Sequence, residues 1–408
     1  MSRILLSLAA FVLTLTSAQA SVVINETNFP DEALRGYASQ YDEDGNGTLS
    51  DAELATITSI NAGGILNLKG AEHFKNLEEL LLWGYSEEES IREIDPSMFP
   101  KLYRFSLGEC NGVTVLDFSR NTMFETIELS RCSNVQALSL PTSVKEIQLF
   151  GAPKLTALDV SRLPNLIGLW LQHTGITDLD FSNHPAIQLV SIQGGEDALD
   201  QMNSLNLQNC ATLENVDIRY TTIKSLSMKH LPIVRTLMML NNDITTITID
   251  DCEEFNDITC DHNVLGTLSL TNNPQLRAVN CEDNRLQVLI ADNCPVLGQV
   301  QVFNNRLMWL DLKDVVKGNV DESILKLDNQ QPTVQAVKLS PTETGLLVHE
   351  RFDVSRVLNL RAKGIAQTPR ETTVDGIRYF VFYNNGPDTP NLVGSDCGYV
   401  YETKWPYP

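Results

Sequence analysis

The sequence predicts a mainly β fold in which short parallel strands stack on both sides of a flattened coil. A small helical cap is expected before this coil and a small all-β domain after it. Three observations support the prediction. An apolar pattern recurs through most of the chain, an acidic loop lies between two helical patterns near the start, and strand-like runs follow the end of the repeat.

The repeat is clearest in three windows, each of which contains L-x-x-L-x-L-x-x-N/C twice: "VRTLMMLNNDITTITIDDC", "FNDITCDHNVLGTLSLTNN" and "LRAVNCEDNRLQVLIADNC". The second and third apolar positions of each unit alternate with a polar residue, which is the period of a strand with one buried face. Successive units begin mostly 10 or 11 residues apart, so two units make a turn of about 21 residues. The first apolar positions are Leu77, Ile91, Leu102, Val113, Phe124, Val135, Val144, Leu155, Leu166, Ile176, Ile187, Met202, Leu213, Ile223, Val234, Ile244, Phe255, Leu265, Leu276, Leu286, Leu297 and Leu307.

This pattern resembles a leucine-rich repeat in which the LxxLxL half is doubled, and the resemblance covers about residues 65–312. An ordinary leucine-rich repeat carries a helix on its second side. Here both halves have the strand signature, so we expect a parallel strand on each side of a stacked solenoid. About ten turns at roughly 4.8 Å each would form a rod on the order of 50 Å long.

The cysteines follow the repeat. Cys110, Cys132, Cys210, Cys252 and Cys294 occupy the N/C position, where a buried side chain caps loop backbone groups. Cys260 and Cys281 are 21 residues apart at an inward strand position. Because buried thiols behave as small hydrophobic groups, we expect stacked free cysteines in preference to a disulfide framework. A zinc site has less support, since the chain has no CxxC pair.

The first twenty residues, "MSRILLSLAAFVLTLTSAQA", have the order of a cleavable secretory signal, with the cut after Ala20. The apolar run is too short for a comfortable membrane span, and the mature chain has no other long apolar run. The formal net charge of −22 disfavours binding to nucleic acid. We therefore expect a secreted or surface-exposed protein without a transmembrane segment.

The stretch "DEDGNGTLSDAE" meets every position of an EF-hand loop. Gly47 supplies the sharp turn and Leu49 the apolar residue at position 8, and the following "DAELATIT" begins a helix. A helical pattern with Pro30, Asp31 and Glu32 at its start precedes the loop. A hard cation prefers six to eight oxygen ligands, so the loop predicts one structural Ca²⁺ site. The expected ligands are Asp42, Asp44, Asn46, Thr48 through its carbonyl, Ser50 and Glu53.

The segment "INETNFPDEALRGYASQYDEDGNGTLSDAE" also resembles the EF-hand-containing cap of secreted bacterial leucine-rich-repeat proteins. The resemblance implies a helical cap at 21–64 that covers the first turn of the solenoid. After a connector at 313–330, five strand-like runs at 331–408 predict a small all-β domain, immunoglobulin-like in type. The closing "WPYP" leaves open whether this domain is complete.

The sequence favours a binding module over an enzyme. The six histidines are scattered, and the chain has no HExxH, GxSxG or P-loop motif. A carboxylate pair for glycoside hydrolysis remains an alternative on composition alone. The aspartates Asp95, Asp117, Asp159 and Asp180 recur at one register, which is more typical of a solvated surface than of a cleft.

We therefore expect a secreted protein that binds an extracellular protein or surface ligand. The alternative is a structural or carbohydrate-binding component of the cell surface. Aromatic and Met side chains at outward strand positions are typical of interface cores. The expected contact residues are Trp83, Phe150, Trp170, Met238, Leu240 and Phe303, and the row of aspartates on the opposite side is a second candidate surface.

Overall fold

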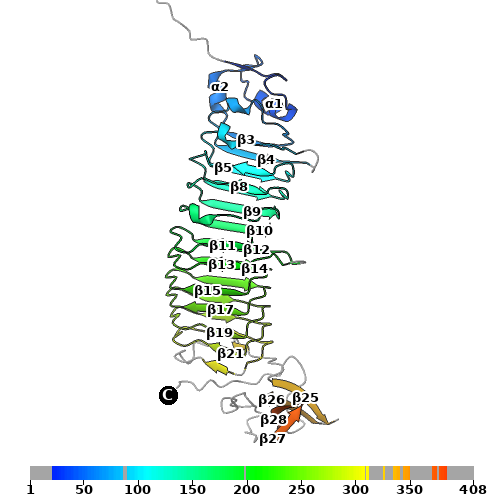
Figure 1. Ribbon diagram of the computed structural model, residues 1–408, viewed down its shortest axis with the longest axis vertical. Coiled ribbons are helices and arrows are strands. Elements are labelled where there is room, and N and C mark those ends of the chain that lie inside the picture. Colours follow the sequence, from blue (N-terminus) through cyan, green and yellow to red (C-terminus); the bar gives the residue numbers. More distant parts are fainter. Residues whose placement is uncertain are drawn as a thin grey trace, which may run out of the picture.

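The computed structural model describes residues 21–85, 90–196, 199–307, 309–311, 325–326, 334–340, 343–349, 370–374 and 376–383. Parallel strands stack in successive turns along the long axis of the molecule, and the two helices lie at the N-terminal end of the stack (Figure 1). The predicted signal peptide lies outside the described residues, as do parts of the two predicted surface loops at 85–90 and 194–200.

The cap contains two short helices and a two-stranded sheet. Its elements are β1 (Val22–Val23), α1 (Glu32–Ser39), β2 (Thr48–Leu49) and α2 (Asp51–Thr56). Asp31 caps α1 by accepting a hydrogen bond from the Leu34 N–H. Ser50 and Glu53 form a reciprocal capping box at the start of α2. Both helices therefore begin where the sequence predicts.

The cap is bonded directly to the first turn of the solenoid. The second carboxylate oxygen of Asp31 accepts from the Leu66 N–H at 2.8 Å, and the Tyr37 hydroxyl donates to the Ser59 carbonyl at 2.6 Å. Phe29 is fully buried and stacks on Phe74, with ring centroids 6.0 Å apart. Stabilisation of the cap should therefore be transmitted to the solenoid.

One side of the solenoid is a continuous parallel sheet, here named the long sheet, with thirteen strands. The sheet begins at β3, within the range assigned to the cap, and its last strand, β24, lies within the range assigned to the connector. The strands are β3 (Ser59–Gly63), β4 (Glu79–Trp83), β5 (Arg104–Gly108), β7 (Thr126–Ser130), β9 (Glu146–Ala152), β10 (Gly168–Thr174), β12 (Leu189–Gln193), β14 (Asn215–Arg219), β16 (Thr236–Leu240), β18 (Asp257–Thr259), β20 (Ala278–Asn280), β22 (Gln299–Gln301) and β24 (Leu325–Lys326).

The opposite side carries shorter parallel sheets, which confirms the prediction of strands on both sides. In the first turns this side contains 3₁₀ segments; one of them starts at Pro96, which lacks the N–H that a strand ladder needs. The elements are η1 (Ala71–His73), η2 (Pro96–Met98), β6 (Val115–Asp117), β8 (Ala137–Ser139), η3 (Val160–Arg162), β11 (Asp178–Asp180), β13 (Ser204–Asn206), β15 (Ser225–Lys229), β17 (Thr246–Asp250), β19 (Thr267–Ser269), β21 (Val288–Ile290) and β23 (Trp309–Asp311).

The core follows the repeat. All the first apolar positions that the repeat predicts are buried, and the most exposed of them, Met202, retains only 2% of its surface. Within the strands, inward and outward side chains alternate, as in the pattern of β14 and β16. The period of the sequence therefore matches the period of the structure.

Buried asparagines connect consecutive turns on the long-sheet side. Asn284 donates to the carbonyls of Cys260 and Glu282, both at 2.9 Å, and accepts from the Leu265 N–H at 3.0 Å. Equivalent residues recur every 21 positions, so each amide satisfies backbone groups of its own turn and of the preceding turn. This row, here named the asparagine ladder, comprises Asn242, Asn263, Asn284 and Asn305.

The cysteine prediction holds for five residues and is wrong for two. Cys110, Cys132, Cys210, Cys252 and Cys294 are free and buried. The sulfurs of the last four lie near backbone carbonyls: the Cys294 thiol, for example, donates to the Leu270 carbonyl at 2.8 Å. Cys260 and Cys281 instead form a disulfide with a Cα–Cα distance of 4.7 Å. Stacking at one inward position of adjacent turns brings their α-carbons within disulfide range.

A four-stranded antiparallel sheet follows the solenoid in sequence, with the order β25-β26-β28-β27. Its strands are β25 (Val334–Ser340), β26 (Glu343–His349), β27 (Arg370–Val374) and β28 (Ile377–Tyr383). Three predicted runs correspond to β25, β26 and β28, whereas the runs at 357–362 and 398–405 lie outside the described residues. An immunoglobulin-like domain packs two sheets, and the described residues of the predicted domain at 331–408 form one.

Candidate functional site

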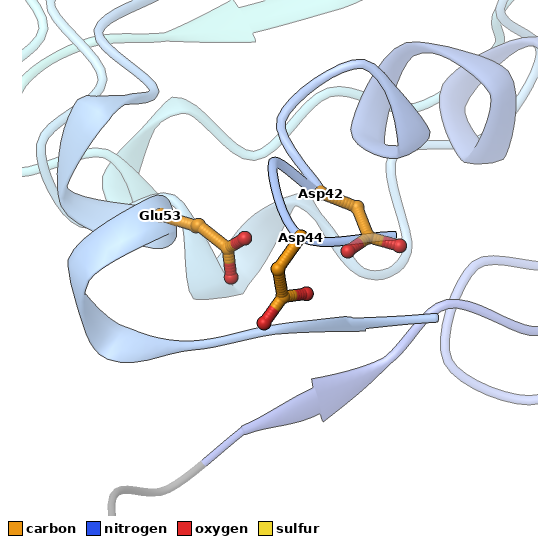
Figure 2. Close-up of side chains that lie close together, drawn as sticks. All are labelled: Asp42, Asp44 and Glu53. Atoms are coloured by element: carbon orange, nitrogen blue, oxygen red, sulfur yellow. The ribbon is translucent and has the colours of Figure 1, made fainter. Parts of the chain in front are cut away.

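The acidic loop of the cap gathers three of the predicted metal ligands. Carboxylate oxygens of Asp42, Asp44 and Glu53 lie within 4.8 Å of one another. Figure 2 shows Asp42 and Asp44 on the loop and Glu53 on α2, with the three side chains around one space. This is the largest concentration of negative charge that the cap brings together within ligand distance.

The loop backbone is arranged around these carboxylates. Asp42 accepts from the N–H groups of Asn46 at 3.1 Å and Gly47 at 2.8 Å. Gly45 and Gly47 have φ angles of 67° and 79°, a region that glycine adopts readily. The tight turn therefore brings Asp42 and Asp44 beside the start of α2.

Glu53 is the most buried of the three carboxylates, with 8% of its surface exposed. It accepts from the N–H groups of Glu43 at 2.9 Å and Ser50 at 2.8 Å, and from the Ser50 hydroxyl at 2.8 Å. The backbone hydrogen bond from Ser50, followed by that from its hydroxyl, lowers the pKa of Glu53 below its ordinary value. The carboxylate is therefore held in its charged form, which is the form that binds a cation.

The remaining predicted ligands have other contacts in this structure. The Asn46 side-chain oxygen accepts from the Thr48 N–H at 2.8 Å, and its amide nitrogen donates to Asp44 at 2.8 Å. Ser50 caps α2. The donor set nevertheless fits a hard cation, because all the groups are oxygens and three are carboxylates.

Five of the six predicted contact residues occupy outward positions on strands of the long sheet, and Phe303 follows β22 by two residues. Trp83 is 41% exposed, and the other five are partly exposed. Phe150 and Trp170 lie on the neighbouring strands β9 and β10, and Met238 and Leu240 lie two residues apart on β16. Intervening strands separate Trp83 and Phe303 from these two pairs. The inside–outside assignment is therefore consistent with the structure, but the six residues do not form one patch.

The tryptophans lie across glycines of the sheet. A side chain at Gly63 would collide with the Trp83 indole, and one at Gly168 would collide with the six-membered ring of Trp170. Tyr85, which is 69% exposed, lies over Gly64 in the same way. The sequence prediction missed Tyr85. The signal in the sequence was the adjacent pair Gly63-Gly64, because residues without side chains leave room for large rings on the surface of the sheet.

Arg219 was also missed, although its outward register was available from the repeat. Its guanidinium binds both carboxylate oxygens of Asp217, at 2.7 and 2.9 Å, and contacts the Met238 sulfur at 2.7 Å. The hydrogen bonds to Asp217 raise the pKa of Arg219. A charged, prearranged Arg beside Met238 and Leu240 is the residue combination enriched at interface cores.

The row of aspartates on the opposite side has a structural role. Each is followed two residues later by a serine that donates to it: Ser119 N–H to Asp117 at 2.9 Å and Ser182 N–H to Asp180 at 2.8 Å are examples. Asp95 and Asp159 accept from the hydroxyls of Ser97 and Ser161, both at 2.6 Å. The recurrence of these acids is therefore explained by turn formation, and it provides little support for a second binding surface.

The described residues offer little that resembles a nucleophilic active site. The free thiols are buried, and burial raises the pKa of Cys110 to about 12 and that of Cys210 to about 11. A thiol that stays protonated is a poor nucleophile. Within the described ranges, no helix is long and apolar enough to cross a membrane.

The doubled repeat, the long parallel sheet and the buried asparagine and cysteine positions define a leucine-rich-repeat solenoid with strands on both sides. No protein-family model matches the chain, and no curated protein matches it. Solved structures do. The functional domain of InlJ from Listeria monocytogenes, described as including a cysteine ladder, is 15% identical with a TM-score of 0.39, and the match covers 91% of this chain and 94% of that chain.

An internalin of Listeria monocytogenes, inlF, is 16% identical with a TM-score of 0.46 and coverage of 78% of this chain and 98% of that one. The LRIM1/APL1C complex matches at 14% identity and a TM-score of 0.30, over 63% of this chain and 46% of that chain. At such identities and TM-scores the ligands of these proteins say nothing about the ligand of this one.

Proposed function

We propose that this protein is a secreted or surface-exposed bacterial interaction module that binds an extracellular protein through the outward face of its long sheet. The observation that carries the proposal is that Trp, Phe, Met and Leu side chains, exposed or partly exposed, occupy outward positions at several places along that one sheet, two pairs of them close together. Such residues dominate binding energy when a partner covers them. The proposal assigns no enzymatic activity to the chain.

Two features support export. The N-terminal sequence has the composition of a secretory signal. The Cys260–Cys281 disulfide suits an oxidising compartment, because cytosolic reductants keep most thiols reduced.

The cap is proposed to hold one structural Ca²⁺ ion. Asp42, Asp44 and Glu53 would supply carboxylates, Asn46 its amide oxygen and Thr48 its carbonyl. Ser50, at loop position 9, caps α2 and donates to Glu53, so its share in binding would be through water. Calcium would relieve the repulsion among the three carboxylates and thereby stabilise the cap.

A glycan is the second candidate ligand, favoured by the surroundings of Trp170. Its indole lies across Gly168, and it is flanked on β9 and β12 by Gln148 and Ser191. Within the described part of the chain, the Gln148 and Gln172 side chains have no hydrogen-bond partner, so their amides are available to an uncharged polar ligand. Such a surface would suit a carbohydrate-binding component of the cell surface.

The binding face can be tested with paired variants of the mature protein used as bait. Replacing Phe150 and Trp170 with Ser, or Met238 and Leu240 with Ser, should weaken binding to a captured protein at least tenfold, because each pair removes interface-type side chains. Melting temperatures should change little, since these side chains point outward.

Val115→Ser is the matched control, because Val115 is 57% exposed but lies on β6, on the opposite side. Binding that survives both pairs, or a large loss of stability in either, would contradict the assignment. Retention of a glycan but of no protein would select the second candidate.

Calcium binding should raise the melting temperature of the mature protein. At a hundredfold excess over Kd, binding to the folded state alone contributes about 2.7 kcal/mol. A chelator should reverse the gain, and Mg²⁺ should reproduce little of it because it demands tight octahedral geometry.

Glu53→Gln should abolish the calcium effect, whereas Glu43→Gln should preserve it, since the Glu43 side chain is exposed and occupies a non-ligand position of the loop. A melting curve that ignores both calcium and chelator, with no heat of binding in calorimetry, would show that the site is vestigial.

A further inference from the structure

The N-terminal strand β1 lies against the acidic loop. Val22 pairs with Leu49 and Val23 with Thr48 in an antiparallel ladder, and the Ile24 N–H donates to the Gly47 carbonyl at 2.9 Å. Figure 2 shows β1 running beside β2, the strand of the loop. Three consecutive loop residues, at EF-hand positions 6 to 8, are thus held by a segment that is not part of the loop.

β1 is anchored to the rest of the cap through a short turn. Asn28 donates from its side-chain amide to the Val23 carbonyl at 2.8 Å, while the Asn25 side chain accepts from the Asn28 N–H at 3.0 Å. The Phe29 N–H donates to the Asn25 carbonyl at 2.8 Å, and Phe29 is fully buried. Val22 and Ile24 pack against the core. The strand is therefore attached at both its backbone and its side chains.

Apart from β1, the constraints at these positions are local. The Gly47 and Thr48 N–H groups donate to side chains within the loop, and the Leu49 side chain is buried. β2 has only two residues, and β1 is the strand with which it pairs. The loop contains three carboxylates that repel one another, and Thr48 is expected to present its carbonyl at the position-7 ligand site. Thr48, whose carbonyl must be oriented for calcium binding, is thus the residue that pairs with Val23.

We propose that β1 is a positioning element for the calcium loop, and that its docking and calcium binding are thermodynamically coupled. The inference rests on the calcium site proposed above. Docking of β1 fixes the backbone of Gly47, Thr48 and Leu49 before the ion binds, so less ordering is required on binding and the affinity is higher. Because such coupling is reciprocal, bound calcium holds β1 against the loop by the same factor.

The variant test uses Ile24, whose N–H is the donor to the loop. In the mature protein, Ile24→Pro removes that N–H and should weaken calcium binding at least tenfold in titration calorimetry. Ile24→Ala is the matched control, because it keeps the N–H while it removes most of the side chain, and it should bind calcium within about threefold of the wild type. Equal affinities for the Pro and Ala variants would overturn the coupling.

Hydrogen exchange on the wild-type protein provides a test that needs no variant. Calcium should slow exchange of the backbone N–H groups at 22–24 together with those of the loop at 42–53. Protection of the loop without protection of 22–24 would overturn the positioning role and leave the calcium site intact. Absence of any calcium-dependent heat or protection would overturn the calcium site and this inference together.

Discussion

Removing the Cys260–Cys281 disulfide is expected to lower the free energy of unfolding of the C-terminal turns by about 3 kcal/mol, the value that the loop-entropy relation gives for a loop of this length. The bond joins residues 21 positions apart in adjacent turns. A double replacement, Cys260→Ala with Cys281→Ala, tests this expectation by chemical denaturation. In this relation the disulfide stabilises the folded state because it lowers the conformational entropy of the unfolded chain.

The effect should be regional. Each turn of a solenoid contacts only its neighbours, so hydrogen exchange should accelerate most in the turns around the missing bond. Cys252→Ala is the matched control, because it removes a buried free thiol whose carbonyl contacts, to Asp250 at 3.6 Å and to Met228 at 3.9 Å, are long. A peptide map that finds Cys260 and Cys281 free, or a double variant as stable as Cys252→Ala, would contradict the expectation.

Asn284→Ala should be destabilising by about 2 kcal/mol. The substitution removes the acceptor of the Leu265 N–H, which is buried. The carbonyls of Cys260 and Glu282 each lose one donor but keep another, from the Asn263 amide and the His262 N–H. A buried polar group without a hydrogen bond costs ~1–3 kcal/mol. The loss should appear as a lower denaturation midpoint. The slope of the unfolding free energy against denaturant concentration should be unchanged.

Asn280→Ala is the control for this experiment. Asn280 is in the same turn on β20 but points outward. Its amide nitrogen donates to the Thr259 hydroxyl at 3.5 Å and its amide oxygen accepts from the Gln299 side chain at 2.8 Å, so its partners are other outward side chains and not buried backbone groups. Its replacement should cost less than about 1 kcal/mol. Similar losses for Asn280 and Asn284 would show that the buried amide contributes no more than a partly exposed one.

The repeat was sufficient to predict the solenoid because one period determines several features together. Leu276 and Leu297 are inward for the same reason that Gln301 is outward, namely their place in the unit. The disulfide was not predictable in this way. The spacing of Cys260 and Cys281 indicates that they stack, but stacking allows either two thiols or a bond.

The calcium loop was recognisable because its ligands are contiguous in sequence. β1 was missed because a strand of two residues is too short to show an alternating pattern. The shared register of Asp117 and Asp180 favours a candidate surface, whereas the serine two residues after each indicates a turn. Outward positions such as Phe150 and Trp170 were identified, while their distribution into separate pairs depends on the order of strands in the sheet.

Because of the asparagine ladder, the solenoid can be lengthened or shortened only by whole turns of 21 residues. Asn263 binds the backbone of its own turn and of the turn before it, so the loss or gain of a few residues between Asn242 and Asn284 would misalign both contacts. Loss of a complete 21-residue unit would instead place Asn242 and Asn284 in consecutive turns, each with equivalent backbone partners. Gene duplication and deletion can therefore lengthen or shorten the rod by about 4.8 Å at a time. The distance between the cap and whatever follows the solenoid is thus a quantity that evolution can change without redesigning the fold.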